Sequence, residues 1–286
     1  MSARRSARPG EYPNLLPLDI VSDGVLTLYR NPAGKVFGEK DAFAINVSWL
    51  LPADMSEAFN QAVDEEAKLA TQHTFAWDPD FGYLSPNPGH CGTGLVIQAE
   101  FHLEGLHLIG DLPPVLAGLD AVRVRADGID ADGIRQAAHM FRLHNNSAIG
   151  LSEHALVKRI RQVYDDVIEQ EISARKALVT DHPRLFEDAI ARSLALLRNA
   201  RLLSPWEFFD LLSPLKMAAT MGFIKGITRR EIDTLMRRQL EKPPTKPPET
   251  EEEERLRDER DADIADRANQ RFADVDLNDR AQDILS

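Results

Sequence analysis

The sequence is poor in cysteine and has no long apolar run. Cys91 is its single cysteine, which excludes a disulfide within the chain and argues against a cysteine-based metal cluster. We therefore expect no metal centre and a reducing, cytoplasmic compartment. No stretch approaches the roughly 20 apolar residues that a membrane helix needs. The opening, MSARRSARPG, is basic, but no apolar segment follows it, so it predicts a disordered arm over residues 1–19 and not a secretory signal.

An excess of basic residues is also missing. Lys and Arg number 34 against 46 Asp and Glu, which gives a formal net charge of −12. A protein that coats DNA or RNA needs a basic face to neutralise phosphates, so we expect neither nucleic acid nor a membrane as a partner. The 286 residues, 43% hydrophobic and 28% charged, are typical of a globular protein with one large domain or two modest ones.

The negative charge is concentrated near the end of the chain. Residues 241–286 hold 15 acidic and 8 basic residues, and they begin with EKPPTKPPETEEEE, which has four prolines and no aromatic residue. Such a composition cannot bury enough apolar surface to offset the entropy lost on ordering. We therefore predict an acidic linker and a disordered tail over 241–286, with at best a marginal helix at 255–272.

Hydrophobic periodicity predicts an α+β chain. Alternating patterns indicate strands, and a helical spacing with a cap at Asp54 or Ser56 indicates one early helix over 53–73. The expected strands are 24–30, 35–37, 43–51, 96–106, 121–126 and 138–144, of which 96–106 also suits a helix. The expected later helices are 152–178, 184–200, 204–221 and 228–240. Capping boxes at Ser204 and Thr228 open the last two helices. We expect an α+β domain over 20–178 and a small all-helical domain over 179–240.

The most unusual local sequence is GYLSPNPGHCGTGL, at residues 82–95. Two prolines and four glycines in fourteen residues indicate a rigid, irregular loop. In its context the segment resembles the Gly-Tyr-Leu-Thr-x-Cys-Pro-x-Asn-x-Gly-Thr-Gly-x-Arg loop of the ATP:guanido phosphotransferase (phosphagen kinase) family. The subgroup it resembles most is the bacterial protein-arginine kinases.

Other stretches resemble further motifs of this family in the same order. They are the acidic stretch 39–41, the turn and long helix over 144–175, and the helical region 187–236. The resemblance implies an antiparallel sheet flanked by helices, Mg-ATP as cofactor, and phosphoryl transfer to a guanidinium. That reaction needs arginines to hold the triphosphate and carboxylates to orient the guanidinium.

Several positions depart from the family pattern. The family's loop cysteine is Asn87 here, its loop asparagine is His90, and its arginine after Gly-Thr-Gly is Val96. Another family histidine and arginine are Ala42 and Ala44. The family's early Ser-x-Arg-x-Arg strand finds no match, because the residues that precede the acidic motif in the family are missing. The resemblance therefore implies that Mg-ATP binding is weak or absent.

A thinner set of family positions survives. Glu39 matches an acidic position, and Asp130 or Asp132 replaces a loop glutamate, so Glu39 and Asp132 are implied as relic catalytic positions. An ordinary solvated carboxylate explains Glu39 equally well. The implied nucleotide-binding residues are Arg123, Arg125, Asn145 and His90, where either Arg123 or Arg125 matches the family arginine.

The acidic tail holds one more candidate. Residues 257–262, RDERDA, resemble the Arg-Asp-x-Arg-Arg-Ala motif that binds phosphoarginine in bacterial protein-arginine kinases. The resemblance implies a phosphoarginine site at Arg257, Asp258 and Arg260. Asp261 replaces the second arginine of the pair and should weaken the site, because like charges repel. A charged helix with i,i+4 pairs is the alternative that we favour.

Three functions follow from the resemblance. The first is a catalytically degenerate homologue that binds a partner arginine kinase, a chaperone or a phosphorylated client. The second is an active kinase that transfers the ATP γ-phosphate to arginine side chains of proteins, with the missing segment supplied by a partner chain. The third is a dimerisation module that forms a homodimer through residues 184–240. Trp206, Phe208 and Phe209 either line the dimer surface, or at least two of them pack in the core.

Overall fold

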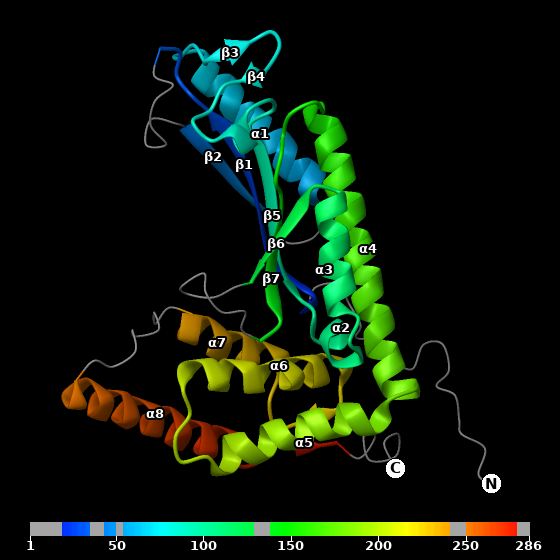
Figure 1. Cartoon of the computed structure of the whole chain (residues 1–286), viewed down its shortest axis with the longest axis vertical. Helices are drawn as coiled ribbons and strands as arrows, with labels where there is room; N and C mark the ends of the chain where they lie inside the picture. Colours follow the sequence, from blue (N-terminus) through cyan, green and yellow to red (C-terminus); the bar gives the residue numbers. More distant parts are fainter. Residues whose placement is uncertain (1–18, 35–42, 50–53, 129–137, 241–249, 279–286) are drawn as a thin grey trace.

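The centre of the molecule is a five-stranded antiparallel sheet (Figure 1). A computed structural model describes residues 19–34, 43–49, 54–128, 138–240 and 250–278. The strands are β1 (Val21–Arg30), β2 (Phe43–Trp49), β5 (Leu95–His102), β6 (Val124–Gly128) and β7 (Met140–Asn145). They lie in the order β2-β1-β5-β7-β6, and every neighbouring pair is antiparallel. The expected α+β class with an antiparallel sheet is confirmed, while the expected strand at 35–37 lies outside the described residues.

Helices cover one face of this sheet. Helices α1 (Met55–Ala70), α3 (Leu112–Ala121) and α4 (Glu153–Thr180) pack against it, and Figure 1 shows α3 and α4 side by side. On β5, Leu95 and Ile97 are buried in the core beneath these helices. The hydroxyl of Tyr164 on α4 lies 2.8 Å from the carbonyl oxygen of Leu143 on β7. The helices and the sheet therefore share one hydrophobic core.

The other face of the sheet carries the alternate side chains, which are mostly polar. We call it the open face. Its members follow from the strand registers and from the alternation of burial along each strand. They are Ala44, Asn46 and Ser48 of β2, Val25, Thr27 and Tyr29 of β1, Val96, Gln98 and Glu100 of β5, Arg142 and His144 of β7, and Arg125 and Asp127 of β6.

The remaining helices form a second hydrophobic cluster. It is built by α5 (Pro183–Asn199), α6 (Pro205–Met221), α7 (Arg229–Leu240) and α8 (Glu251–Phe272), with a small ladder of β8 (Ile224–Lys225) and β9 (Asp276–Leu277). Short elements complete the fold: β3 (Trp77–Asp78), β4 (Gly82–Tyr83) and α2 (Glu104–Ile109). No helix among the described residues is long and apolar enough to cross a membrane.

A buried polar network joins the sheet to α4 and α6. Ser213 of α6 lies 2.8 Å from Nε2 of His102 and donates a hydrogen bond to Glu104 at 2.5 Å. On α4, Glu171 accepts the backbone amide of Gly105 at 2.8 Å and the guanidinium of Arg175 at 2.6 Å. Burial raises the pKa of Glu171, and the Arg175 guanidinium opposes that rise. These contacts fix the junction between the two hydrophobic clusters.

The tail departs from expectation. A disordered tail over 241–286 is wrong for residues 250–277, because α8 packs on α5 and α6. Its buried side chains recur at helical spacing: Ile264, Ala265, Ala268 and Phe272. Thr250 and Glu253 close a capping box at its start. The acidic composition of the segment hides this narrow apolar face. Because the face packs on α5 and α6, α8 does not have to be stable as an isolated helix.

The other helices divide into confirmed and missed ones. The five helices expected at 53–73, 152–178, 184–200, 204–221 and 228–240 are confirmed. The caps at Ser204 and Thr228 form, whereas Asp54 begins α1 without a side-chain hydrogen bond.

Helices α2 and α3 are not among the expected elements. The stretch 96–106, expected as one strand or one helix, divides into a strand and the start of α2, and no element is expected at 112–121. The strand ends at His102, and α2 ends where Gly110 adopts a φ of 86°.

Phe208 and Phe209 are buried in the core and Trp206 packs against it, which confirms the core alternative for these aromatic residues.

Candidate functional site

The segment 82–94, which we call the glycine loop, is packed tightly against its surroundings. Gly82, Gly92 and Gly94 have φ values of 73°, 94° and 63°. A Cβ on Gly92 would lie 2.6 Å from the carbonyl oxygen of Ala148, and one on Gly94 would lie 2.4 Å from that of Tyr29. These positions therefore require glycine both for conformation and for space. The loop is held against β1 and against the turn that precedes α4.

A fully buried arginine anchors this loop. The Arg30 guanidinium donates to Glu153 of α4 at 2.8 Å, to Glu66 of α1 and to the carbonyl oxygen of Thr93 at 2.6 Å. It also lies 3.7 Å from the centre of the Tyr83 ring. The arginine joins β1, α1, α4 and both ends of the glycine loop, and its charge is neutralised by two carboxylates. Arg30 is therefore a structural cation and is not available to a ligand.

One end of the open face carries an aromatic stack next to neutral side chains. The rings of Tyr29 and His90 are 4.0 Å apart and nearly parallel, at 7°. Thr27 donates to the side chain of Asn46 at 2.7 Å. Ala44 pairs with Tyr29 across β1 and β2, and Val96 pairs with Thr27 across β1 and β5. This end of the face offers stacking and amide groups but no charge among these side chains.

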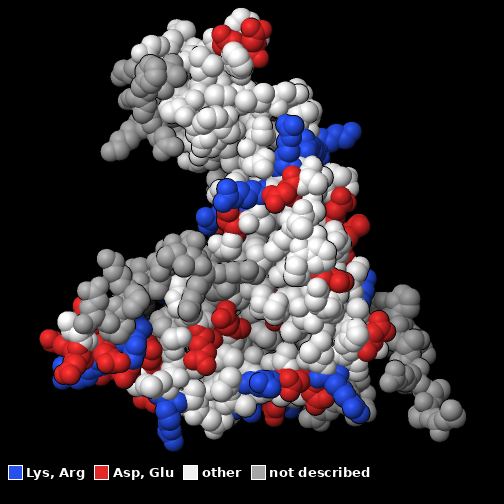
Figure 2. Space-filling view, viewed as in Figure 1, with Lys and Arg blue, Asp and Glu red and all other residues white. Residues whose placement is uncertain are grey.

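The other end carries charges in neighbouring pairs. Arg125 contacts Asp127 at 2.8 Å, and Arg142 contacts Glu100 at 2.8 Å. His144 also contacts Asp127 at 2.8 Å. Burial alone would raise the pKa of Asp127, but the hydrogen bonds from His144 and Arg125 outweigh it and lower that pKa. Figure 2 shows basic and acidic side chains side by side at the waist, where the outline of the molecule is hollowed.

The structure places the expected nucleotide-binding residues in different environments. Arg125 and His90 lie on or beside the open face, and Arg123 precedes β6 with a φ of 56° and an exposed side chain. Asn145 is buried and points away from that face. It accepts the amide of Ile97 at 2.8 Å and donates to the carbonyl of Leu95 at 2.9 Å. It therefore ties β7 to β5.

The remaining expected positions do not join this group. Glu39, Asp130 and Asp132 lie outside the described residues, so nothing is concluded about them. Arg257, Asp258 and Arg260 lie on α8, which Figure 1 shows at the opposite end of the molecule from β3 and β4. Arg257 pairs with Asp258 at 2.9 Å, and Arg260 pairs with Asp261 at 2.9 Å. The tail candidate and the sheet candidate are thus separate sites.

Sequence reasoning missed the Arg30 cluster. Arg30 ends a strand pattern and Glu66 lies on the polar side of a predicted helix, so each looks like an ordinary solvated charge. Only the tertiary fold brings them together with Glu153, 123 positions along the chain from Arg30. Among the described residues, no three His, Cys, Asp or Glu side chains are grouped closely enough to hold a metal ion.

Two family profiles match most of the sequence. "ATP:guanido phosphotransferase, C-terminal catalytic domain" matches residues 38–174, and "Protein-arginine kinase McsB C-terminal domain" matches residues 183–283. A protein-arginine kinase from Moorella thermoacetica is 33% identical over 193 residues, which are 67% of this chain and 55% of that protein. One from Exiguobacterium sp. is 33% identical over 181 residues, 63% of this chain and 52% of that protein. The chain spans about half the length of the curated relatives it matches.

Solved structures with a similar arrangement include the duplicated taurocyamine kinase from Schistosoma mansoni. The form with bound transition state analog components matches with a TM-score of 0.44 at 11% identity and covers 70% of this chain and 41% of that one. The substrate-free form gives a TM-score of 0.45 at 11% identity and covers 68% of this chain and 41% of that one.

Proposed function

The chain belongs to the ATP:guanido phosphotransferase family, close to the bacterial protein-arginine kinases, and from this premise we propose that it is a catalytically degenerate member that acts by binding. Its partners would be an arginine kinase, a chaperone or a phosphorylated client. The observation that carries the proposal is the chemistry of the open face. Ala44 and Val96 stand there at positions where the family pattern has arginines.

The described part of the open face fits a magnesium-bound triphosphate poorly. A triphosphate needs several forked donors that are free to turn toward its oxygens. Arg125 and Arg142 are instead paired with Asp127 and Glu100, and both carboxylates would repel a phosphate. Arg30 is fully buried between two carboxylates. The arrangement supports weak or absent nucleotide binding.

The binding free energy lost with the two family arginines favours a catalytically degenerate protein over an enzyme that is merely slower. A charge-assisted hydrogen bond contributes roughly 1.5–3 kcal/mol. Removing the contacts of two arginines would cost on the order of 5 kcal/mol in binding the nucleotide and the transition state, with allowance for non-additivity. That corresponds to a rate reduction on the order of thousands-fold.

Calorimetric titration of the full chain with MgATP tests the proposal. We expect no binding heat at millimolar nucleotide, and no transfer of labelled γ-phosphate to arginine in a protein substrate. A dissociation constant in the micromolar range, or labelled phosphoarginine formed by the chain alone, would establish the active kinase instead. Activity that appears only when a second protein is added would establish a kinase completed by a partner chain.

We also propose a homodimer through the helical domain, residues 184–240. Helix α5 exposes Leu185 and Leu196, and Leu202 follows it with 52% of its surface exposed. Exposed leucines on and just after α5 favour association, because covering them removes apolar surface from water. Light scattering of the full chain should give twice the chain mass of 32.0 kDa. A monomer at tens of micromolar would contradict the dimer.

The tail candidate remains a proposal of its own. If residues 257–262 recognise phosphoarginine, Arg257 and Arg260 would hold the phosphate, and binding should weaken steeply with salt. Free phosphoarginine should then shift the NMR signals of Arg257 and its neighbours, and Asp261→Arg should increase the affinity. If neither protein responds, the segment is a charged helix whose arginines pair with Asp258 and Asp261.

A further inference from the structure

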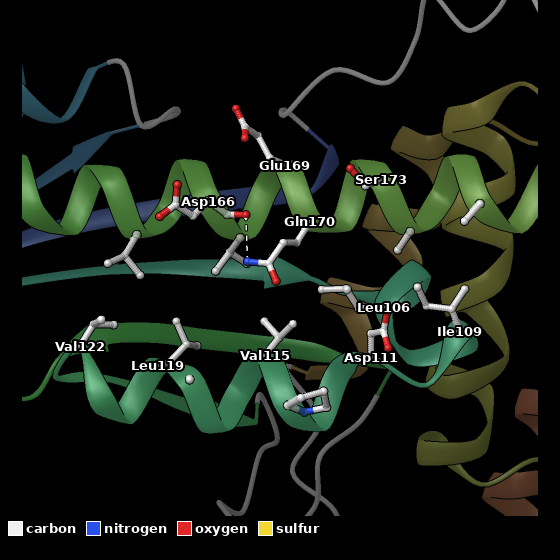
Figure 3. A pocket seen from close by; sticks show the side chains of 16 residues that line it. Leu106, Ile109, Asp111, Val115, Leu119, Val122, Asp166, Glu169, Gln170 and Ser173 are labelled. Atoms are coloured by element: carbon white, nitrogen blue, oxygen red, sulfur yellow. Dashed lines mark hydrogen bonds between the residues drawn. The ribbon is translucent and has the colours of Figure 1, made fainter.

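A groove between α3 and α4 lies on the helical side of the molecule, away from the open face of the sheet. Its volume is about 990 Å³. Figure 3 shows Val115 and Leu119 of α3 pointing toward α4, with Leu106 and Ile109 at the end formed by α2. Neither the glycine loop nor α8 lines it. None of the functions discussed above uses this groove.

Its floor is apolar and its charged lining is acidic. Val163 and Val167 of α4 complete the apolar floor, and the charged residues that line the groove are Asp111, Asp166 and Glu169. Asp166 and Glu169 are exposed to solvent, and Gln170 bonds the backbone carbonyl of Asp166 at 3.2 Å, as the dashed line in Figure 3 shows. The described residues that line the groove include no Lys or Arg. At the Val122 end, the cation Arg159 donates to the backbone oxygen of Val122 at 2.5 Å, and the exposed Arg123 is the next residue of the chain.

The dimensions suit a short helix. Helix α3 has ten residues and is therefore about 15 Å long, which matches roughly three turns of a helix laid beside it. Two helices with a gap of apolar side chains between them accept a third helix through residues spaced at i, i+3, i+4 and i+7. The acidic lining adds a charge requirement to this shape.

We propose that the groove between α3 and α4 binds an amphipathic helix of a partner protein, with an apolar stripe against the more accessible Val115, Val122 and Val163 and with Lys or Arg beside Asp166, Glu169 and Asp111. Charge complementarity favours this occupant, because all three charged residues of the lining are acidic, so that they attract a basic helix and repel an acidic one. The proposal names a partner class for a protein that acts by binding, but it depends on neither the state of the nucleotide site nor the dimer.

The test uses a fluorescent synthetic peptide of 16 residues, with leucine at i, i+3, i+4 and i+7 and lysine elsewhere, titrated into the full chain. A matched peptide carries glutamate in place of lysine. The blocking variant is Gly118→Leu, since a Cβ at Gly118 meets nothing within 4 Å and the new side chain projects from α3 at the groove. The charge variant is Asp166→Lys with Glu169→Lys, and circular dichroism confirms that each variant keeps its helix content.

We expect the lysine peptide to bind at least ten-fold more tightly than the glutamate peptide, and to lose at least ten-fold in affinity in both variants. Binding should also weaken with salt. Binding that Gly118→Leu leaves unchanged, or no binding at all, would overturn the proposal. Two further outcomes would replace it. If the lysine peptide binds only after Arg4, Arg5 and Arg8 are changed to serine, the groove is assigned to the chain's own first residues. If the apparent affinity for the peptide falls as the protein concentration rises, the groove is assigned to a second copy of the chain.

Discussion

Ala44 of β2 and Val96 of β5 lie on the same open face of the sheet, on either side of β1. Tyr29 is the register partner of Ala44, and Thr27 is the register partner of Val96. Two arginines at these positions would point into the space above Thr27 and Asn46. The face would then hold two cations that have no neighbouring carboxylate on β1.

The double variant Ala44→Arg with Val96→Arg should gain only weak affinity for MgATP, in the millimolar range. The added guanidinium groups supply forked donors, but Glu100 and Asp127 remain on the face and continue to repel phosphate. Calorimetry measures the change. The matched control is Ser48→Arg, which adds an arginine to the same face of β2 beside Val25 instead of Tyr29. Equal gains in the two proteins would show a non-specific charge effect.

Replacing Arg30 by Met should destabilise the fold by about 3–5 kcal/mol, because it leaves the carboxylates of Glu66 and Glu153 without their buried cation. Urea denaturation followed by circular dichroism measures the loss. Lys68→Met removes the exposed ion pair with Glu65 and should leave the denaturation midpoint where it is. If Arg30→Met leaves the denaturation midpoint unchanged, Arg30 does not anchor the glycine loop.

The glycine loop makes a second structural prediction. Gly92 and Gly150 both have positive φ, at 94° and 83°, but only a Cβ on Gly92 would meet backbone atoms, the nearest at 2.6 Å. Gly150→Ala should cost about 1 kcal/mol for the strained conformation. Gly92→Ala should cost about 3 kcal/mol, because the loop must also move away from Ala148. Thermal unfolding of both variants separates the two effects, and equal losses would argue against close packing of the loop.

Local sequence signals are enough to predict the long helices. Contacts between residues far apart in the sequence could not be predicted in this way. The Ser204 and Thr228 caps lie within four residues of the atoms they satisfy, so the sequence alone locates them. The role of Arg30 depends on Glu153, and that of Asn145 depends on Ile97. These partners are 123 and 48 positions apart in the sequence, so no local pattern predicts that they meet. Asn145 was expected at a nucleotide site because of its family motif, whereas its side chain cross-links two strands.

In the tail the prediction is wrong for another reason: the overall composition was given more weight than the spacing of the apolar residues. Four prolines and a run of glutamates argued for disorder over 241–286, although apolar residues at 264, 265, 268 and 272 share one helical face. That face is too narrow to stabilise a helix alone. The existence of a partner surface on α5 and α6 decides the outcome, and the sequence of the tail does not contain that information.

The buried His102 predicts a loss of stability in mild acid. Burial lowers its pKa well below the ordinary value, and the neighbouring charges of Lys216 and Arg175 lower it further. In the folded protein the His102 imidazole therefore stays neutral, whereas in the unfolded chain it takes up a proton near pH 6.5. The stabilising contribution is present above that pH and falls by up to about 1.4 kcal/mol per pH unit as the pH drops below it.

The variant His102→Gln should flatten this pH dependence while it lowers stability at neutral pH, because it disturbs the contact with Ser213. Burial also lowers the pKa of His107, so the double variant with His107→Gln should be flatter still. Urea titrations at a series of pH values from neutral to mildly acidic give the slopes. An unchanged slope in His102→Gln would mean that other groups carry the acid sensitivity.

The packing of α8 can be tested at its buried end. Phe272 is fully buried among residues of the second hydrophobic cluster, and the backbone near it is held by Arg198 of α5, which donates to the carbonyl of Phe272 at 3.1 Å. Phe272→Ala should therefore cost about 3–5 kcal/mol in unfolding free energy. Leu256→Ala is the matched control on the same helix, since 54% of Leu256 is exposed, and its cost should stay within about 0.5 kcal/mol. Similar small costs for both variants would mean that α8 does not contribute to the cooperative unit. A large cost for Phe272→Ala alone would establish that the acidic C-terminal helix is part of the folded helical domain.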